Sequence, residues 1–140
     1  MMEIAHLTVS LNAREILSDF SARFPTGQVS CLVGPNGCGK TTLLRALAGL
    51  IPADAGKALL DGENLLTMPR RQRALHLAYL PQSRPVPQLR AGLLIEHGRF
   101  PHEGFSKRLD ENGRKAIEQA MVQTNTGHLA HRYVGGFWSA

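Results

Sequence analysis

The chain has 140 residues, about the length of one domain, and its hydrophobic (43%) and charged (19%) fractions are ordinary for a globular protein. It has no uninterrupted apolar run of about 18 residues and no leader that is first basic and then apolar, so we expect a cytosolic protein that reaches a membrane only through a partner. The net charge of +5 comes from 16 basic and 11 acidic residues that are not interleaved with aromatic residues, which disfavours a nucleic-acid partner. Two cysteines, Cys31 and Cys38, are too few for a disulfide framework, and Cys31 stands in an apolar run, so we expect it in the core.

The beginning of the sequence predicts strands. Residues 4–11 mix apolar and β-branched side chains, and residues 15–24 alternate between apolar and polar ones, the period of two of a half-buried strand. A turn is expected at residues 12–14. Residues 29–33 (VSCLV) form a nearly continuous apolar run, which is typical of a strand buried on both faces of a parallel sheet.

The glycine-rich loop that follows carries the strongest chemical signal of the chain. Residues 34–41 (GPNGCGKT) match the P-loop pattern, a glycine, four residues and then Gly-Lys-Thr. The glycines let the backbone adopt conformations that a side chain would block, so several N–H groups can converge on one anion. A helix expected over residues 40–48 and ended by Gly49 adds the positive end of its dipole.

This chemistry assigns roles to the polar side chains of the loop. We expect Lys40 to reach the β- and γ-phosphates of a nucleotide, Thr41 to ligate Mg²⁺, and Thr42 to donate to the α-phosphate. The P-loop alone leaves open a kinase, a GTPase or a transporter. The expected phosphate-binding residues are Gly34, Pro35, Asn36, Gly37, Cys38, Gly39, Lys40, Thr41 and Thr42.

Beyond the loop, the sequence predicts short elements and then mainly helices. A strand is expected over residues 57–60, and a basic helix runs from Pro69 to about residue 75, where the arginines are read as a solvated helix face. Residues 77–80 predict one more strand, and the proline-rich residues 81–87 predict a loop. Two later helices are expected over residues 89–97 and 109–124, the second with an apolar face made by Ala116, Ile117, Ala120 and Met121.

Two segments carry a family resemblance. Residues 32–45 (LVGPNGCGKTTLLR) resemble the Walker A region of ABC transporter ATPases, and residues 79–82 (YLPQ) resemble the Q-loop of that family. The resemblance implies an ATP site in which Gln82 contacts Mg²⁺ and the attacking water; the alternative is a polar loop residue after a strand. It also implies an α/β fold with a P-loop NTPase core, in which N-terminal antiparallel strands and a partial parallel sheet precede the start of an ABC-type helical subdomain.

A narrower resemblance concerns the cargo. Residues 97–102 (HGRFPH) resemble a stretch in importers of ferric siderophores, ferric citrate, haem and cobalamin, so iron-chelate import driven by ATP hydrolysis is the expected function. The resemblance implies membrane permease subunits as partners, a homodimer of nucleotide-binding subunits, and a peripheral position on the inner face of the cell membrane. The histidines show no metal-ligand spacing, so we expect four of them on the surface, namely His97, His102, His128 and His131.

One position departs from the family pattern. An aromatic residue usually follows the Val-Ser of the first strand and stacks on adenine, but here Leu11 follows Val9 and Ser10. Leucine covers a purine face by dispersion without the π contribution. We therefore expect Leu11 to pack on adenine weakly.

The resemblance ends near Val134, and the family's signature motif, Walker B strand and switch histidine have no counterpart in these residues. We expect a chain whose C-terminal half is missing, with a partial ATP-binding core over 1–84, a partial helical subdomain over 85–134 and an unrelated tail over 135–140. Without a group that positions water, the chain alone should not hydrolyse ATP, and an exposed apolar sheet edge should favour aggregation. Two alternatives stay open: a non-catalytic nucleotide-binding or regulatory fragment, and another P-loop NTPase such as a kinase.

Overall fold

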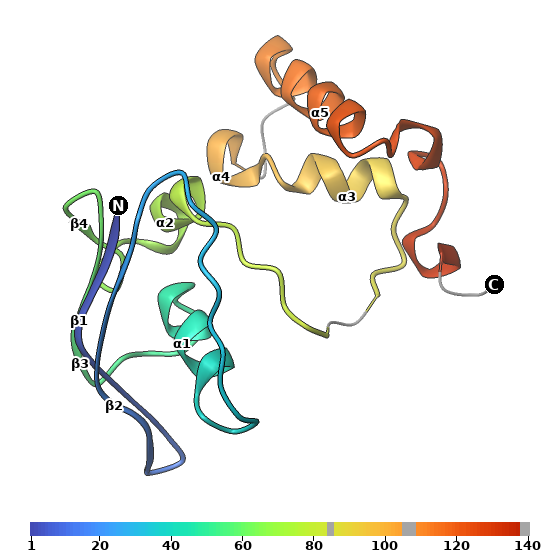
Figure 1. Cartoon of the computed structure of the whole chain (residues 1–140). Helices are drawn as coiled ribbons and strands as arrows, with labels where there is room; N and C mark the ends of the chain where they lie inside the picture. The colour runs from blue at the N-terminus through green and yellow to red at the C-terminus, as the bar shows by residue number, and fades with distance from the viewer. Residues whose placement is uncertain (84–85, 105–108, 138–140) are drawn as a thin grey trace. The chain divides into compact units, whose positions relative to one another are not determined.

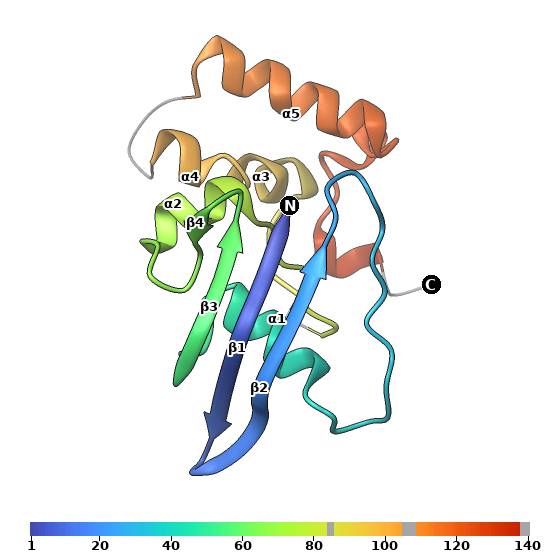
Figure 2. The same ribbon diagram turned by 60° about the vertical axis from the view of Figure 1, so that its left-hand side comes forward.

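The computed structural model describes residues 1–83, 86–104 and 109–137, and it divides the chain into two units, Met1–Tyr79 and Leu80–Ala140 (Figure 1). The first unit is built on a four-stranded antiparallel sheet with the strand order β2-β1-β3-β4. The strands are β1 (Met2–Leu11), β2 (Arg14–Phe24), β3 (Ala55–Leu60) and β4 (Glu63–Asn64). Helix α1 (Lys40–Leu47) lies against one face of this sheet, as Figure 1 and Figure 2 both show. The expected α/β class and the N-terminal antiparallel hairpin are confirmed.

The core of the first unit forms where the inward side chains of the sheet meet α1. Side chains alternate between the two faces of a strand, and in β2 the predicted alternation is confirmed, because Phe20, Ala22 and Phe24 are half-buried while the residues between them are exposed. The buried apolar residues of this core are Ile4, Leu7, Val9, Leu17, Leu43, Ala46, Leu47, Ala58, Leu65 and Met68.

The pairing of β1 with both of its neighbouring strands is irregular near the middle of β1. The register of β1 shifts after Ile4 against β2 and after Ala5 against β3. His6 (φ 54°) and Asp19 (φ 48°) take left-handed backbone conformations there, and His6 Nδ1 lies 2.7 Å from Asp19 Oδ1. On the other side of β1, Gly56 has φ 96°, and a Cβ on it would lie 2.4 Å from the carbonyl oxygen of His6. Glycine therefore lets β3 pass the bulge at close range.

The N-terminus is fastened to the loop after β3. The N-terminal ammonium group of Met1 pairs with the carboxylate of Asp61, and the Asp61 N–H donates to the Met1 carbonyl oxygen at 3.1 Å. Both residues line an apolar cavity of about 430 Å³, whose other walls include Phe24, Leu32 and Leu43. The first residue of the chain is thus part of the folded unit.

Some predictions for residues 1–80 are wrong. Residues 29–33 and 77–80 are not strands, and Cys31 is exposed and not in the core. Val29 is 101% exposed and Val33 is 85% exposed. An extended segment becomes a strand only when a neighbour supplies the ladder hydrogen bonds, and no strand pairs with either segment in the described part of the chain. For the same reason the partial parallel sheet is absent from those residues, since every pairing of the four strands is antiparallel.

The end of α1 and the later helix of the first unit are as predicted. Gly49 (φ 69°) follows α1, which confirms the predicted stop. The predicted basic helix is confirmed as α2 (Arg70–His76), with Pro69 at its N-cap.

The second unit is helical. It contains α3 (Ala91–His97), α4 (Phe100–Glu103), α5 (Glu111–Gln123) and two 3₁₀ turns, η1 (Gly127–Leu129) and η2 (Val134–Phe137). The start of α3 is joined to the later chain by backbone hydrogen bonds from Gly92 to Ala130 (2.9 Å) and from Ala91 to Arg132 (2.9 Å). Asp110 caps α5 by accepting the N–H of Gly113 at 2.6 Å.

Both predicted helices of this unit are confirmed, although the sequence did not predict α4 or the 3₁₀ turns. The predicted apolar face of α5 is half-buried, whereas the residues around it are mostly exposed. None of the helices found in residues 1–83, 86–104 and 109–137 has the length and the apolar character required to cross a bilayer.

Candidate functional site

The glycine-rich loop, residues 34–39, connects an irregular segment to α1 and stands at the surface. Gly37 (φ 84°) and Gly39 (φ 94°) both adopt the left-handed backbone conformation, which residues with a Cβ atom rarely adopt. Inside the loop, the Cys38 N–H donates to the Pro35 carbonyl oxygen over 3.4 Å. Glycine at positions 37 and 39 therefore allows the tight turn of this loop.

The loop leans on β2 at the point where α1 begins. Gly39 is buried, and a Cβ on it would lie 2.7 Å from Cδ2 of Leu17 and 3.3 Å from the carbonyl oxygen of Ile16. A glycine is thus required for a second reason, which is close approach to the sheet. This contact could not be predicted from the sequence, since Ile16 and Leu17 belong to a strand that is separated from the loop along the chain.

Lys40 folds its side chain back over the loop. Its Nζ donates to the carbonyl oxygens of Gly34 (2.8 Å) and Pro35 (2.7 Å) and lies 3.6 Å from Cys38 Sγ. The Cys38 thiol in turn crowds Gly34, where a Cβ would lie 2.9 Å from the sulfur. These contacts hold a full positive charge at the loop.

The start of α1 adds unpaired donors to this charge. Among the described residues, Leu43 is the first residue of α1 whose N–H donates to a backbone carbonyl oxygen, that of Gly39 at 2.8 Å. The N–H groups at a helix start have no acceptor within the helix and point outward, together with the positive end of the helix dipole. An exposed loop with such donors and one ammonium group is suited to a phosphate group.

The two threonines after Lys40 differ in their surroundings. The structure leaves Thr41 exposed at the surface, while Thr42 is only 9% exposed. A hydroxyl group at the surface is accessible to a hydrated cation, which suits the magnesium role expected of Thr41.

The remaining predicted site residues lie outside the loop. Leu11 is half-buried at the end of β1 and pairs with Arg14 of β2. Arg14 precedes Ile16, whose carbonyl oxygen approaches Gly39, by two residues. Gln82 belongs to the second unit and lines a cavity of about 440 Å³, together with Leu80, Pro81, Ser83, Val86, Pro87 and Val134. The loop and Leu11 thus belong to one unit and Gln82 to the other. No group of three or more histidine, cysteine, aspartate or glutamate side chains that could hold a metal ion occurs among the described residues.

Comparison with known proteins gives a consistent result. A family model described as ABC transporter matches residues 17–137. The petrobactin import ATP-binding protein FpuD of Bacillus anthracis is 33% identical over 134 residues, which are 95% of this chain and 49% of that protein. The hemin import ATP-binding protein HmuV of Pseudomonas entomophila is 35% identical over 133 residues, 94% of this chain and 51% of that protein. The iron(3+)-hydroxamate import ATP-binding protein FhuC of Bacillus subtilis is 33% identical over 127 residues, 90% of this chain and 47% of that protein.

The chain thus spans about half the length of these relatives. Solved structures extend the likeness to the fold. A nucleotide-free ATP-binding cassette from an ABC transporter superposes with a TM-score of 0.73 at 21% identity, over 96% of this chain and 58% of that one. The ATP-binding cassette MJ1267 of an ABC transporter gives a TM-score of 0.74 at 20% identity, with the same coverage of 96% and 58%.

Proposed function

The chain belongs to the ABC transporter family, and we propose that residues 34–42 bind the phosphate groups of ATP. One observation carries the proposal: the Lys40 ammonium group is held at the loop by two carbonyl oxygens, beside the unpaired N–H groups that begin α1. A triphosphate bound there would contact both the ammonium charge and the backbone N–H donors. This combination favours an anionic ligand over a neutral one.

The metal ion and the second loop complete this proposed site. The exposed Thr41 hydroxyl fits Mg²⁺, a hard cation that prefers oxygen ligands, and Gln82 is the proposed second contact. The ion, when bound, would neutralise charge on the phosphate oxygens. Thr42 is proposed to donate to the α-phosphate and Leu11 to pack on the adenine ring.

For the intact protein we propose a nucleotide-binding subunit that couples ATP binding and hydrolysis to import of an iron chelate. The names of three relatives support this, since they are import ATP-binding proteins for petrobactin, hemin and iron(3+)-hydroxamate. Such a subunit would pair with a second copy and dock on membrane permease subunits at the inner face of the membrane. That the 140 residues alone do not hydrolyse ATP stays a prediction.

The test of the nucleotide site is a calorimetric titration of the chain with ATP, ADP and AMP in the presence of Mg²⁺. We expect ATP and ADP to bind and AMP to bind at least about tenfold more weakly, because the charge-assisted contacts fall on the β- and γ-phosphates. Equal affinity for AMP and ATP would refute the proposal that residues 34–42 bind the phosphate groups. The absence of any ATP binding by the folded chain would also refute it.

A second prediction concerns the base. Leu11→Tyr should tighten ATP binding by about twofold to tenfold, because an aromatic ring adds a stacking contribution that leucine lacks. The affinity for inorganic tripolyphosphate, which has no base, should not change. Leu11→Ala serves as the matched control and should weaken ATP binding slightly. An unchanged ATP affinity in the tyrosine variant would remove the assignment of Leu11 to the adenine.

A further inference from the structure

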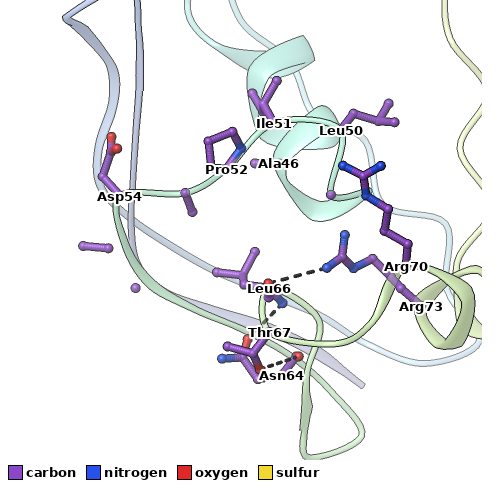
Figure 3. A pocket seen from close by; sticks show the side chains of 14 residues that line it. Ala46, Leu50, Ile51, Pro52, Asp54, Asn64, Leu66, Thr67, Arg70 and Arg73 are labelled. Atoms are coloured by element: carbon purple, nitrogen blue, oxygen red, sulfur yellow. Dashed lines mark hydrogen bonds between the residues drawn. The ribbon is translucent and has the colours of Figure 1, made fainter.

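The first unit contains a second cavity that shares no residue with the loop of residues 34–42. It has a volume of about 450 Å³ and lies between the chain that follows α1, residues 49–56, and the turn that leads into α2 (Figure 3). Leu50, Ile51 and Leu66 supply apolar wall, and Arg70 and Arg73 reach it from α2. Pockets of this size hold small organic molecules.

Arg73 is the unusual member of this lining because it is only 7% exposed. Its Nε donates to the Leu65 carbonyl oxygen at 2.7 Å, and its Nη2 donates to the Met68 carbonyl oxygen at 2.8 Å and to that of Leu66 at 3.5 Å. These bonds fix the side chain in one orientation. They also close the turn between β4 and α2, which explains why a charged side chain is retained inside the unit.

The third nitrogen of this guanidinium group has no such acceptor among the residues that the structure describes. Nη1 lies beside Gly49, where a Cβ would come within 1.1 Å of it. Gly49 lines the same cavity, so Nη1 stands at its wall with its N–H donors unused. An N–H donor at the wall of a cavity can donate to an acceptor atom of a ligand that enters the cavity.

The charges around the cavity point to the sign of the ligand. In the described part of the chain, neither Arg70 nor Arg73 has a carboxylate within ion-pair distance. The acidic residue that lines the cavity, Asp54, lies on the far side in Figure 3 and accepts the Ser10 N–H at 2.6 Å. Two guanidinium groups thus face the cavity against one carboxylate that is already bonded, which leaves the arginine end without a counter-ion.

We propose that this cavity binds a small organic molecule through a phosphate or carboxylate group, with Arg73 and Arg70 as the anion-binding residues. A planar guanidinium group matches the oxygen spacing of both groups. The cavity exceeds what an isolated oxyanion fills, and its apolar wall at Leu50, Ile51 and Leu66 accommodates the rest of the ligand. The site is separate from the proposed nucleotide site, so the chain has two places for an anion.

The test uses the 140-residue chain and phenyl phosphate as the probe, with inorganic phosphate and phenol as the two partial probes. Binding is followed through the NMR signal of the Arg73 Nε–H group, which reports this cavity and not the glycine-rich loop. We expect phenyl phosphate to shift that signal saturably, and to do so equally in Lys40→Ala, in which the proposed nucleotide site is weakened. Inorganic phosphate alone should bind more weakly, because it leaves the apolar wall uncovered; equal affinity would contradict the proposal that the ligand is an organic molecule.

The variant that decides is Arg70→Gln, since Arg70 is exposed and its loss leaves the buried Arg73 network in place. We expect it to weaken phenyl phosphate binding by about tenfold. Arg71→Gln, on the same helix but outside the cavity lining, should bind like the unaltered chain. Equal binding by the two variants would overturn the proposal, as would a saturable shift by phenol of the same affinity or no shift by phenyl phosphate.

Discussion

Replacing Lys40 by alanine should weaken ATP binding by roughly tenfold to a hundredfold, the range expected when a hydrogen bond to a charged group is lost. The Lys40 ammonium group donates to the carbonyl oxygens of Gly34 and Pro35 and lies near the sulfur of Cys38. Lys40 is not among the residues of the core cluster, so its replacement takes a positive charge from the loop and leaves the core residues unchanged. The affinity is measured by calorimetric titration with ATP and Mg²⁺.

Lys57→Ala is the matched control for this variant. Lys57 is an exposed lysine of β3, so the control removes the same charge from the same unit away from the loop. Its ATP affinity should equal that of the unaltered chain, and both variants should retain the circular dichroism spectrum of the folded chain. If the two variants bind ATP equally well, the loop is not the phosphate site and the proposed function loses its basis.

Gly56→Ala should destabilise the fold by about 2–5 kcal/mol, the sum of a strained left-handed conformation and of overpacking. The added methyl group would meet backbone atoms of β1, at 2.4 Å from the His6 carbonyl oxygen and 2.6 Å from Cα of Leu7. Backbone atoms of a paired strand cannot move aside as the end of a flexible side chain does. The bulge that β3 passes would have to open, and with it the pairing that joins β3 to the hairpin.

Gly62→Ala separates the two contributions to this loss. Gly62 has nearly the same backbone angle as Gly56, φ 91° against 96°, but a Cβ on it would meet no atom within 4 Å. Its cost should be the strain alone, about 1–2 kcal/mol. Urea unfolding of the three chains gives the difference through the transition midpoints at constant slope. Equal losses in the two variants would contradict the close approach of β1 and β3.

Local patterns were enough to predict the parts of the fold that depend on near neighbours in the chain. The hairpin follows from the alternation in residues 15–24, and the loop and helix from the spacing of glycines before Lys40. Residues 29–33 have the composition of a buried strand, but a strand also needs a partner, and composition carries no information on whether one is present. The same reason explains Cys31, which an apolar run placed in the core and the structure leaves exposed.

Contacts between distant segments account for the rest. Leu17 beneath Gly39 could not be inferred from the sequence, because the two residues meet only after β2 and α1 have packed. The arginines of α2 have the pattern of a solvated helix face, and for Arg73 this interpretation is wrong, since its guanidinium group is buried against carbonyl oxygens of the preceding turn. Which arginine turns inward is decided by the turn it closes and not by the helix that carries it.

The ion pair between the first amino group and Asp61 has a practical consequence for anyone who prepares this polypeptide. A purification tag fused ahead of Met1 converts the ammonium group into a neutral amide and attaches extra chain at a residue that lines the apolar cavity, together with Phe24 and Leu43. A tag attached at the C-terminus leaves the ion pair between Met1 and Asp61 intact. Stability compared between the two fusion formats would therefore report directly on how firmly the leading residue is anchored.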